Sequence, residues 1–201
     1  MTISLPRFSL VLALPEDEDE RLRLWARSAP PATWPAWGGH VTIWPALEPA
    51  EGIDALVARL QAVVARFEAY ELSIGDVALK PFWGSPHLYT AQLVPGQHDT
   101  GRSELDGLRA GLYQSLGDVA IDLHPETRSN WFEPHISLTV GLEHDAAASV
   151  VEAARRDGLR ARFVVQRVDL IESLGEGLYA RLGIFALAPQ QERPERRSRG
   201  H

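Results

Sequence analysis

Two short stretches of this chain repeat one pattern 95 residues apart, and together they constrain the fold more than any other feature. Residues 40–43 read His-Val-Thr-Ile, and residues 135–138 read His-Ile-Ser-Leu. In a β-strand, successive side chains point to opposite faces. Each stretch therefore predicts a half-buried strand with a histidine and a hydroxyl on one face and two aliphatic residues on the other.

The pair of motifs is far more informative than one copy. From the residue frequencies, about 0.1 matches per chain are expected by chance, so two are roughly a 1% event. A single copy is readily explained as a hydrogen-bonded histidine on a half-buried strand, but that structural explanation is weak for a matched pair. Two such strands facing one cleft would bring together two imidazoles and two hydroxyls, which suits acid–base chemistry on a phosphate.

Length and charge limit the domain organisation and the partners. The chain has 201 residues and a formal net charge of −7. It reads as one domain over residues 1–189 and a polar, disordered tail over residues 190–201. A net negative charge disfavours binding of long nucleic acid, because phosphate neutralisation drives that affinity. A small phosphorylated substrate in a local pocket stays compatible, and we expect a monomer.

The sequence lacks the features of cysteine-based sites, membrane spans and secretion signals. With no cysteine, the chain has no disulfide, thiolate nucleophile or thiolate metal site. The sequence has no apolar run long enough to span a bilayer. Residues 1–7 lack the layout of a signal peptide. We therefore expect a cytoplasmic protein with no membrane partner.

Apolar periodicity and breaker residues predict strands and helices in alternation. The expected strands cover residues 8–14, 40–45, 70–79, 88–94, 135–138, 161–173 and 178–187. The expected helices cover residues 15–28, 53–67, 103–116 and 145–156, with Ser103 and Asp145 at the starts of the last two. Residues 29–39 and 122–130 are expected as loops. Each half of the chain thus reads strand, helix, histidine strand, helix, strand, which predicts an α+β fold of two lobes related by a pseudo-twofold axis.

The two motifs resemble those of the two-histidine (2H) phosphoesterase superfamily, which includes 2′,3′-cyclic nucleotide phosphodiesterases and RNA 2′,5′-ligase-like proteins. Pro134, directly before the second histidine, is common there, and the strand order extends the resemblance to about Pro189. The resemblance implies a bilobal α+β fold with antiparallel sheets, flanking helices and a central cleft. It also implies hydrolysis of cyclic phosphates or 2′-linked phosphodiesters with no metal and no other cofactor. Residues 8–12 and 131–134 look more like the cyclic phosphodiesterase branch.

One departure from that family pattern stands beside the first motif. Gly38 and Gly39 precede His40 where a proline is frequent in the family. The departure implies a looser lead-in to the first histidine strand, with the chemistry retained.

The resemblance assigns roles to the four polar residues of the motifs. His40 and His135 are the expected catalytic pair, with His40 as general acid and His135 as general base. One would enter the reaction protonated and the other neutral. Thr42 and Ser137 are expected to bind the phosphate by donating hydrogen bonds to its non-bridging oxygens.

Other side chains are weaker candidates for substrate contacts. Tyr89, Trp44 and Trp83 could stack on a nucleobase, although packing or ordinary exposure is the favoured explanation for each. Lys80 and Arg128 could balance phosphate charge, although an exposed cation is the usual case. The remaining histidines have no metal-ligand spacing, so no metal is expected.

These observations favour one function and leave two alternatives. The first is metal-independent hydrolysis of a 2′,3′-cyclic nucleotide, a related cyclic phosphate or a short RNA end. The second is an RNA 2′,5′-phosphodiesterase or ligase-like enzyme, which would need a basic surface that the net charge of −7 does not indicate. The third is a binding module for a phosphorylated metabolite. The two intact histidine–hydroxyl pairs argue against that module, because binding alone does not require two proton-transfer groups.

Overall fold

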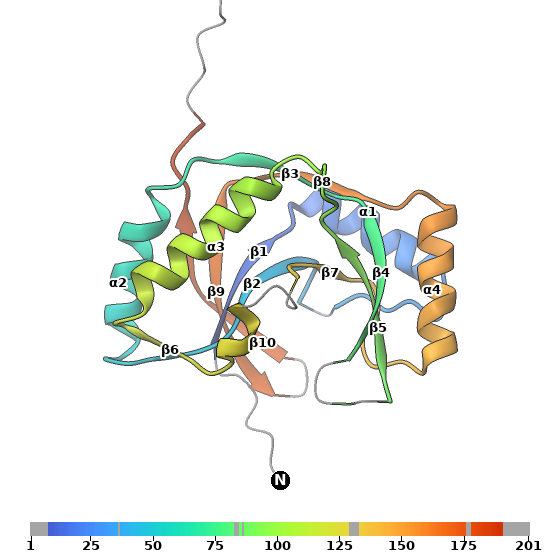
Figure 1. Ribbon diagram of the computed structural model, residues 1–201, viewed down its shortest axis with the longest axis horizontal. Coiled ribbons are helices and arrows are strands. Elements are labelled where there is room, and N and C mark those ends of the chain that lie inside the picture. The colour runs from blue at the N-terminus through green and yellow to red at the C-terminus, as the bar shows by residue number, and fades with distance from the viewer. Residues whose placement is uncertain are drawn as a thin grey trace, which may run out of the picture.

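The first histidine motif lies on a five-stranded antiparallel sheet (Figure 1). The computed structural model describes residues 8–35, 37–82, 85, 87–128, 133–175 and 178–190. Across the sheet the strands follow the order β10 (Leu178–Ala186), β9 (Arg167–Gly175), β1 (Phe8–Ala13), β2 (His40–Pro49) and β6 (Ala120–Asp122). The central strand β1 is covered on both faces, since the consecutive residues Leu10, Val11 and Leu12 are all buried.

The second histidine motif lies on a separate three-stranded antiparallel sheet. Its order is β4 (Asp76–Pro81), β5 (Tyr89–Val94) and β7 (Ile136–Ser137). A two-stranded antiparallel sheet pairs β3 (Tyr70–Ile74) with β8 (Ala161–Val165). β7 contacts β2, so the two motif strands lie side by side although they belong to different sheets (Figure 1).

Two helices cross from the strands that precede them to the opposite part of the molecule. The helices are α1 (Glu16–Ser28), α2 (Ile53–Val64), α3 (Arg102–Leu116) and α4 (His144–Arg156). α1 connects β1 to β2, yet it packs on β8, and its Trp25 Nε1 donates to Asp157 Oδ2 at the end of α4 (3.0 Å). α3 follows β5 of the three-stranded sheet and leads to β6 of the five-stranded sheet. It packs on α2, and its Arg109 Nε donates to Ile43 O of β2 (3.1 Å). The antiparallel sheets and the helices around them confirm the expected two-lobed α+β fold.

Two strand predictions are wrong in the same way. Residues 70–79 and 161–173 were each expected to form one strand, but each segment contains two strands of different sheets. The breaks fall at Gly75, whose N–H donates to Asp99 Oδ2 (3.0 Å), and at Gln166, whose carbonyl accepts from Leu187 N (2.9 Å). Apolar residues continue through both breaks because the chain passes from one buried sheet directly into another.

The first histidine strand also extends further than expected. β2 continues through Pro45 to Pro49. A proline has no N–H for the strand ladder, but the register between β1 and β2 shifts in this segment, and the Ser9 hydroxyl donates to Pro45 O (2.7 Å). The second motif strand is shorter than expected, since only Ile136 and Ser137 pair with β5. The expected loop over residues 122–130 contains the end of β6 and a 3₁₀-helix, η1 (Pro125–Arg128).

The expected starts of two helices are displaced by one or two residues. Gly101 and Glu143 occupy the N-cap positions of α3 and α4, with no side-chain cap at either. Ser103 and Asp145 lie inside the first turns instead. An acidic side chain such as Asp145 is favourable there because the helix N-terminus carries partial positive charge.

The core is shared by the sheets and the helices around them. The predicted helical stripe of α3 is confirmed, because each of its leucines is at most 1% exposed: Leu105, Leu108, Leu112 and Leu116. The last strand is joined to the domain beyond its end, since Ala188 N donates to Phe67 O (2.8 Å). Residues 191–201 of the expected tail lie outside the described residues. Across the described parts of the chain, none of the helices has the length and apolar character needed to cross a membrane.

Candidate active site

Burial alternates along both motifs as the pattern predicts. Val41 and Ile43 are 0% and 1% exposed, and Ile136 and Leu138 are both 0% exposed. The histidine and the hydroxyl of each motif are half-buried instead. His40 and Thr42 therefore share the open face of β2, and His135 and Ser137 share the open face of the neighbouring segment.

The two imidazoles are anchored in the same way. His40 Nδ1 lies 2.9 Å from Gly38 O, and His135 Nδ1 lies 2.9 Å from Glu133 O. A carbonyl oxygen only accepts hydrogen bonds, so Nδ1 carries the proton and donates in both residues. In each neutral imidazole Nε2 is then the unprotonated nitrogen, suited to accept a proton. Each histidine thus has Nδ1 held by the backbone and Nε2 as its basic nitrogen.

Burial makes both imidazoles weaker bases than an ordinary histidine. Burial lowers the pKa of His40, against the opposing effects of its hydrogen bond to Gly38 O and the charge of Asp19. The pKa of His135 is lowered to about 4, first by burial, and further by the charges of His40 and Lys80. Without a ligand, both rings are therefore neutral at pH 7. The influence of His40 on His135 also reflects the close approach of the two motifs.

The lead-in to His40 is held tightly, so the expected looseness at the two glycines is wrong. Gly39 N donates to Asp19 Oδ1 (2.5 Å), and Gly39 O accepts from Leu14 N (3.0 Å). A proline at this position would lack the N–H that Asp19 accepts. A Cβ at position 39 would lie 2.4 Å from Trp34 Cζ2 and 2.5 Å from Leu14 Cδ1. Glycine is required here because the chain passes against these side chains.

The support around His135 comes from a residue that the sequence did not single out. Glu133 supplies the carbonyl that fixes the ring, and its carboxylate lies 3.8 Å from Lys80 Nζ and 3.4 Å from Arg102 Nη1. The candidate cation Lys80 is thus placed near the second motif. Arg128 lies instead against Asp122 (2.6 Å) and over the Tyr113 ring (4.9 Å).

The hydroxyls of the two motifs remain open to a ligand. Within the part of the chain that the structure describes, neither the Thr42 nor the Ser137 hydroxyl forms a hydrogen bond to another protein group. Thr42 is paired with Val11 of β1, and Ser137 with Gln92 of β5, so both backbones are held in the sheets. Each hydroxyl follows its histidine by two residues on the same face, as the prediction of a shared phosphate site requires.

The aromatic candidates lie in different surroundings. Trp44 is 0% exposed, and its ring packs on Tyr113 with centroids 4.2 Å apart. Strict alternation would place Trp44 on the open face, but the register shifts, so that Thr42 pairs with Val11 and Trp44 with the adjacent Leu10. This irregularity turns Trp44 into the core beside Ile43, which supports the packing explanation for Trp44.

The two other aromatic candidates differ in what the structure describes. Tyr89 is half-buried on β5, edge-on to the His144 ring with centroids 4.9 Å apart. Trp83 lies outside the described residues. A further aromatic, Trp37, was not singled out from the sequence, yet its ring lies edge-on to His40 with centroids 5.3 Å apart. Its position in a Pro- and Gly-rich loop gave no periodic signal.

No three acidic or histidine side chains gather as a metal-binding cluster among the described residues. The described site offers two imidazoles and two hydroxyls, with Lys80 near the second motif. A neutral imidazole accepts a proton, an imidazolium donates one, and hydroxyls donate hydrogen bonds to phosphate oxygens.

Comparison with solved structures finds the same fold. The Thermus thermophilus protein TT0787 is similar at a TM-score of 0.59 and 18% identity, covering 92% of this chain and 100% of that one. Escherichia coli LigT complexed with phosphate is similar at a TM-score of 0.57 and 19% identity, covering 91% of this chain and 98% of that one. LigT complexed with 3′-AMP gives a TM-score of 0.57 and 18% identity, covering 90% of this chain and 97% of that one.

Comparison at the level of sequence identifies the family. No curated protein matches the chain. The model of the family described as the 2′-5′ RNA ligase superfamily matches residues 14–177, which include both histidine motifs. The chain therefore belongs to the 2′-5′ RNA ligase superfamily, whose members are two-histidine (2H) phosphoesterases.

Proposed function

We propose that the chain is a metal-independent phosphodiesterase that hydrolyses a 2′,3′-cyclic nucleotide or a related cyclic phosphate. The observation that carries this proposal is the matched anchoring of His40 and His135, each with Nδ1 fixed by a backbone carbonyl. Two proton-transfer nitrogens beside two hydroxyls are what cleavage of a phosphodiester needs. The LigT structure with 3′-AMP adds support, because that relative holds a small nucleotide.

In the proposed reaction, His135 Nε2 takes a proton from water while the water oxygen attacks phosphorus. The bond from phosphorus to the 2′ or 3′ oxygen breaks, and His40 Nε2–H donates a proton to that oxygen. Thr42 and Ser137 donate hydrogen bonds to the non-bridging oxygens as negative charge builds there. After one turnover His40 is neutral and His135 is protonated, and exchange with water restores the starting state.

The assignment of acid and base follows the electrostatics. The charge of Asp19 favours the protonated form of His40, whereas the charge of Lys80 disfavours the protonated form of His135. His40 is therefore the better acid, and His135 stays available as base. The bound phosphate anion would raise the pKa of both rings, which makes protonation of His40 feasible during the reaction.

The family match supports a second candidate reaction. The description of the family names a 2′-5′ RNA ligase, and the same two histidines could act on a 2′,5′ phosphodiester. The net charge of −7 favours small nucleotides or short RNA ends over long nucleic acid. We propose that the protein acts on such substrates as a monomer in the cytoplasm.

Turnover of a panel of 2′,3′-cyclic mononucleotides in EDTA tests the proposal directly. We expect a single nucleoside monophosphate product, and a rate that the chelator does not change. Loss of activity in EDTA with recovery on addition of zinc would contradict the metal-free reaction. Ligation or cleavage of 2′,5′ linkages without turnover of any cyclic nucleotide would favour the ligase-like reaction. Binding of phosphorylated metabolites without any turnover would favour the binding module.

The pH dependence should be shifted to acid. kcat/KM reports the pKa values of the free enzyme. With increasing pH, kcat/KM should first rise near pH 4, where His135 loses its proton. It should then decrease with a midpoint under pH 6.5, where His40 loses its proton, because the pKa of His40 lies under its ordinary value. The kcat profile should lie at higher pH, since bound phosphate favours both imidazolium forms. A kcat/KM still increasing above pH 7 would contradict these roles.

A further inference from the structure

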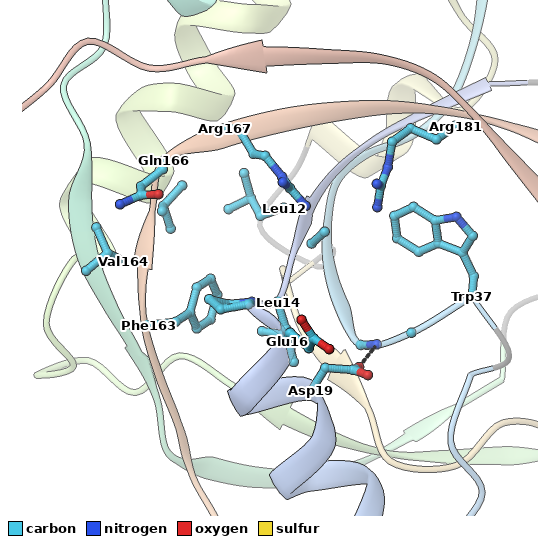
Figure 2. A pocket seen from close by; sticks show the side chains of 15 residues that line it. Leu12, Leu14, Glu16, Asp19, Trp37, Phe163, Val164, Gln166, Arg167 and Arg181 are labelled. Atoms are coloured by element: carbon cyan, nitrogen blue, oxygen red, sulfur yellow. Dashed lines mark hydrogen bonds between the residues drawn. The ribbon is translucent and has the colours of Figure 1, made fainter.

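A separate pocket lies beside His40, with a volume of about 410 Å³ (Figure 2). Neither catalytic histidine lines it, but Gly38, whose carbonyl anchors His40, and Trp37, whose ring meets the His40 imidazole, both do. The pocket therefore adjoins the candidate active site at Trp37 and Gly38. Figure 2 shows Arg167 and Arg181 pointing into the pocket from one side.

The sheet register places these arginines on the same face as the catalytic motif. Asp169 of β9 pairs with Val11 of β1, and Val11 pairs with Thr42 of β2. Residues paired directly across an antiparallel sheet project from the same face. Asp169, which joins the two arginines, thus lies in one row with the hydroxyl assigned to the reacting phosphate.

Asp169 holds both arginines in position. It is 0% exposed, and its two oxygens lie 3.1 Å from Arg167 Nε and 2.9 Å from Arg181 Nε. Both arginine side chains are 40% exposed. The closest approach in both ion pairs is through Nε, and each guanidinium carries four further N–H donors on its terminal nitrogens. Two guanidinium groups against one carboxylate give this end of the pocket a net positive charge, in a protein whose overall charge is −7.

Trp37 connects this positive end to the active site. The Arg181 guanidinium carbon lies 5.3 Å from the centre of the Trp37 ring. The centre of the His40 ring also lies 5.3 Å from the centre of the Trp37 ring. The imidazole and the guanidinium are therefore no more than twice that distance apart. The two phosphates of a ribose that is phosphorylated at both ends lie within this limit.

The opposite end of the pocket carries negative charge. Glu16 and Asp19 line it there, and Figure 2 shows them across the cavity from the two arginines. Asp19 already accepts from Trp34 Nε1 (2.9 Å) and from Gly39 N. The carboxylates keep an anion away from this end, so a bound anion would be directed to Arg167 and Arg181.

We propose that this pocket is a subsite for a second phosphate of the substrate, one ribose away from the phosphate that reacts. The inference rests on the proposed function, since the reacting phosphate is placed at His40 and His135. Guanidinium groups suit such a ligand because their fork of donors matches phosphate oxygens. The second phosphate is either a 5′ monoester on a cyclic mononucleotide or the internal diester of a short RNA end.

Three substrates test the subsite and separate these sources. They are adenosine 2′,3′-cyclic phosphate, the same compound with a 5′-phosphate, and the dinucleotide ApA with a 2′,3′-cyclic end. We expect kcat/KM to be about tenfold higher with a second phosphate, the typical effect of one charge-assisted hydrogen bond. Preference for the monoester alone identifies a mononucleotide, and preference for the diester alone identifies an RNA end. Equal kcat/KM for all three overturns the inference.

Arginine variants test whether a preference for the second phosphate arises in this pocket. Arg181→Met and Arg167→Met should reduce the ratio of kcat/KM values to about one, whereas Arg181→Lys should retain part of it. Arg59→Met is the matched control, because Arg59 is 43% exposed, pairs with Asp118 on another surface and does not line the pocket. A preference unchanged in Arg181→Met and Arg167→Met would overturn the assignment. Thermal unfolding of each variant shows whether it is folded.

Failure of the subsite and failure of the proposed function give different results. Turnover of every cyclic substrate with no preference rejects the subsite alone. If no cyclic substrate is cleaved, calorimetry compares adenosine 3′,5′-bisphosphate with 3′-AMP. Tighter binding of the bisphosphate that is lost in Arg181→Met supports the subsite without the reaction, and equal binding rejects both.

Discussion

Alanine in place of either His40 or His135 should lower kcat by about 10²–10⁴-fold, the usual contribution of general acid–base catalysis. Each imidazole has Nδ1 committed to a backbone carbonyl, so proton transfer falls on Nε2 alone. Removing one ring leaves the other unable to act as acid and base in the same step. The measurement is steady-state kinetics on the best cyclic nucleotide of the panel.

The two histidine variants should also differ in their pH profiles. His135→Ala removes the base and should abolish the rise near pH 4, and His40→Ala removes the acid and should abolish the fall. His98→Ala is the control, because His98 is exposed and outside both motifs. Full activity of His135→Ala on every cyclic phosphate tested would refute the two-histidine reaction.

Removing the motif hydroxyls should have the second largest effect. Thr42→Val and Ser137→Ala should each lower kcat by about 10²-fold, within the range found when one donor to a developing negative charge is lost. KM should change much less, since these donors matter most as charge builds in the transition state. Thr42→Ser and Ser137→Thr keep a hydroxyl and should retain activity. If the variants raised KM and left kcat unchanged, the two residues would contribute to substrate binding alone.

The strongest predictions from the sequence were those with a regular period. The alternation of His40, Val41, Thr42 and Ile43 indicated which side chains would be buried, and the structure agrees. The helical stripe of α3 and the two-lobed α+β fold were predicted in the same way, because each element has one apolar face. The roles of the site residues stay predictions until the kinetics are measured.

The features that the sequence could not predict lie where the chain departs from the regular spacing of strands and helices. Trp44 follows Thr42 by two residues, yet the shifted register turns it into the core. Gly75 and Gln166 separate strands of different sheets although the apolar pattern runs through them. Trp37, Arg167 and Arg181 come together from a loop and two strands distant in sequence, and only the fold brings them to one pocket.

The crossing of α1 and α3 has a mechanical consequence. α1 joins two strands of the five-stranded sheet but packs on β8, and α3 passes from the three-stranded sheet to the five-stranded sheet, so separating the lobes would pull packed helices away from their neighbours. We expect this packing to resist hinge motion between the lobes, so that the distance between the two imidazoles changes little at each turnover. Such an enzyme would select its substrate by fit to a rigid aperture, and no part of the binding energy would go into closing it.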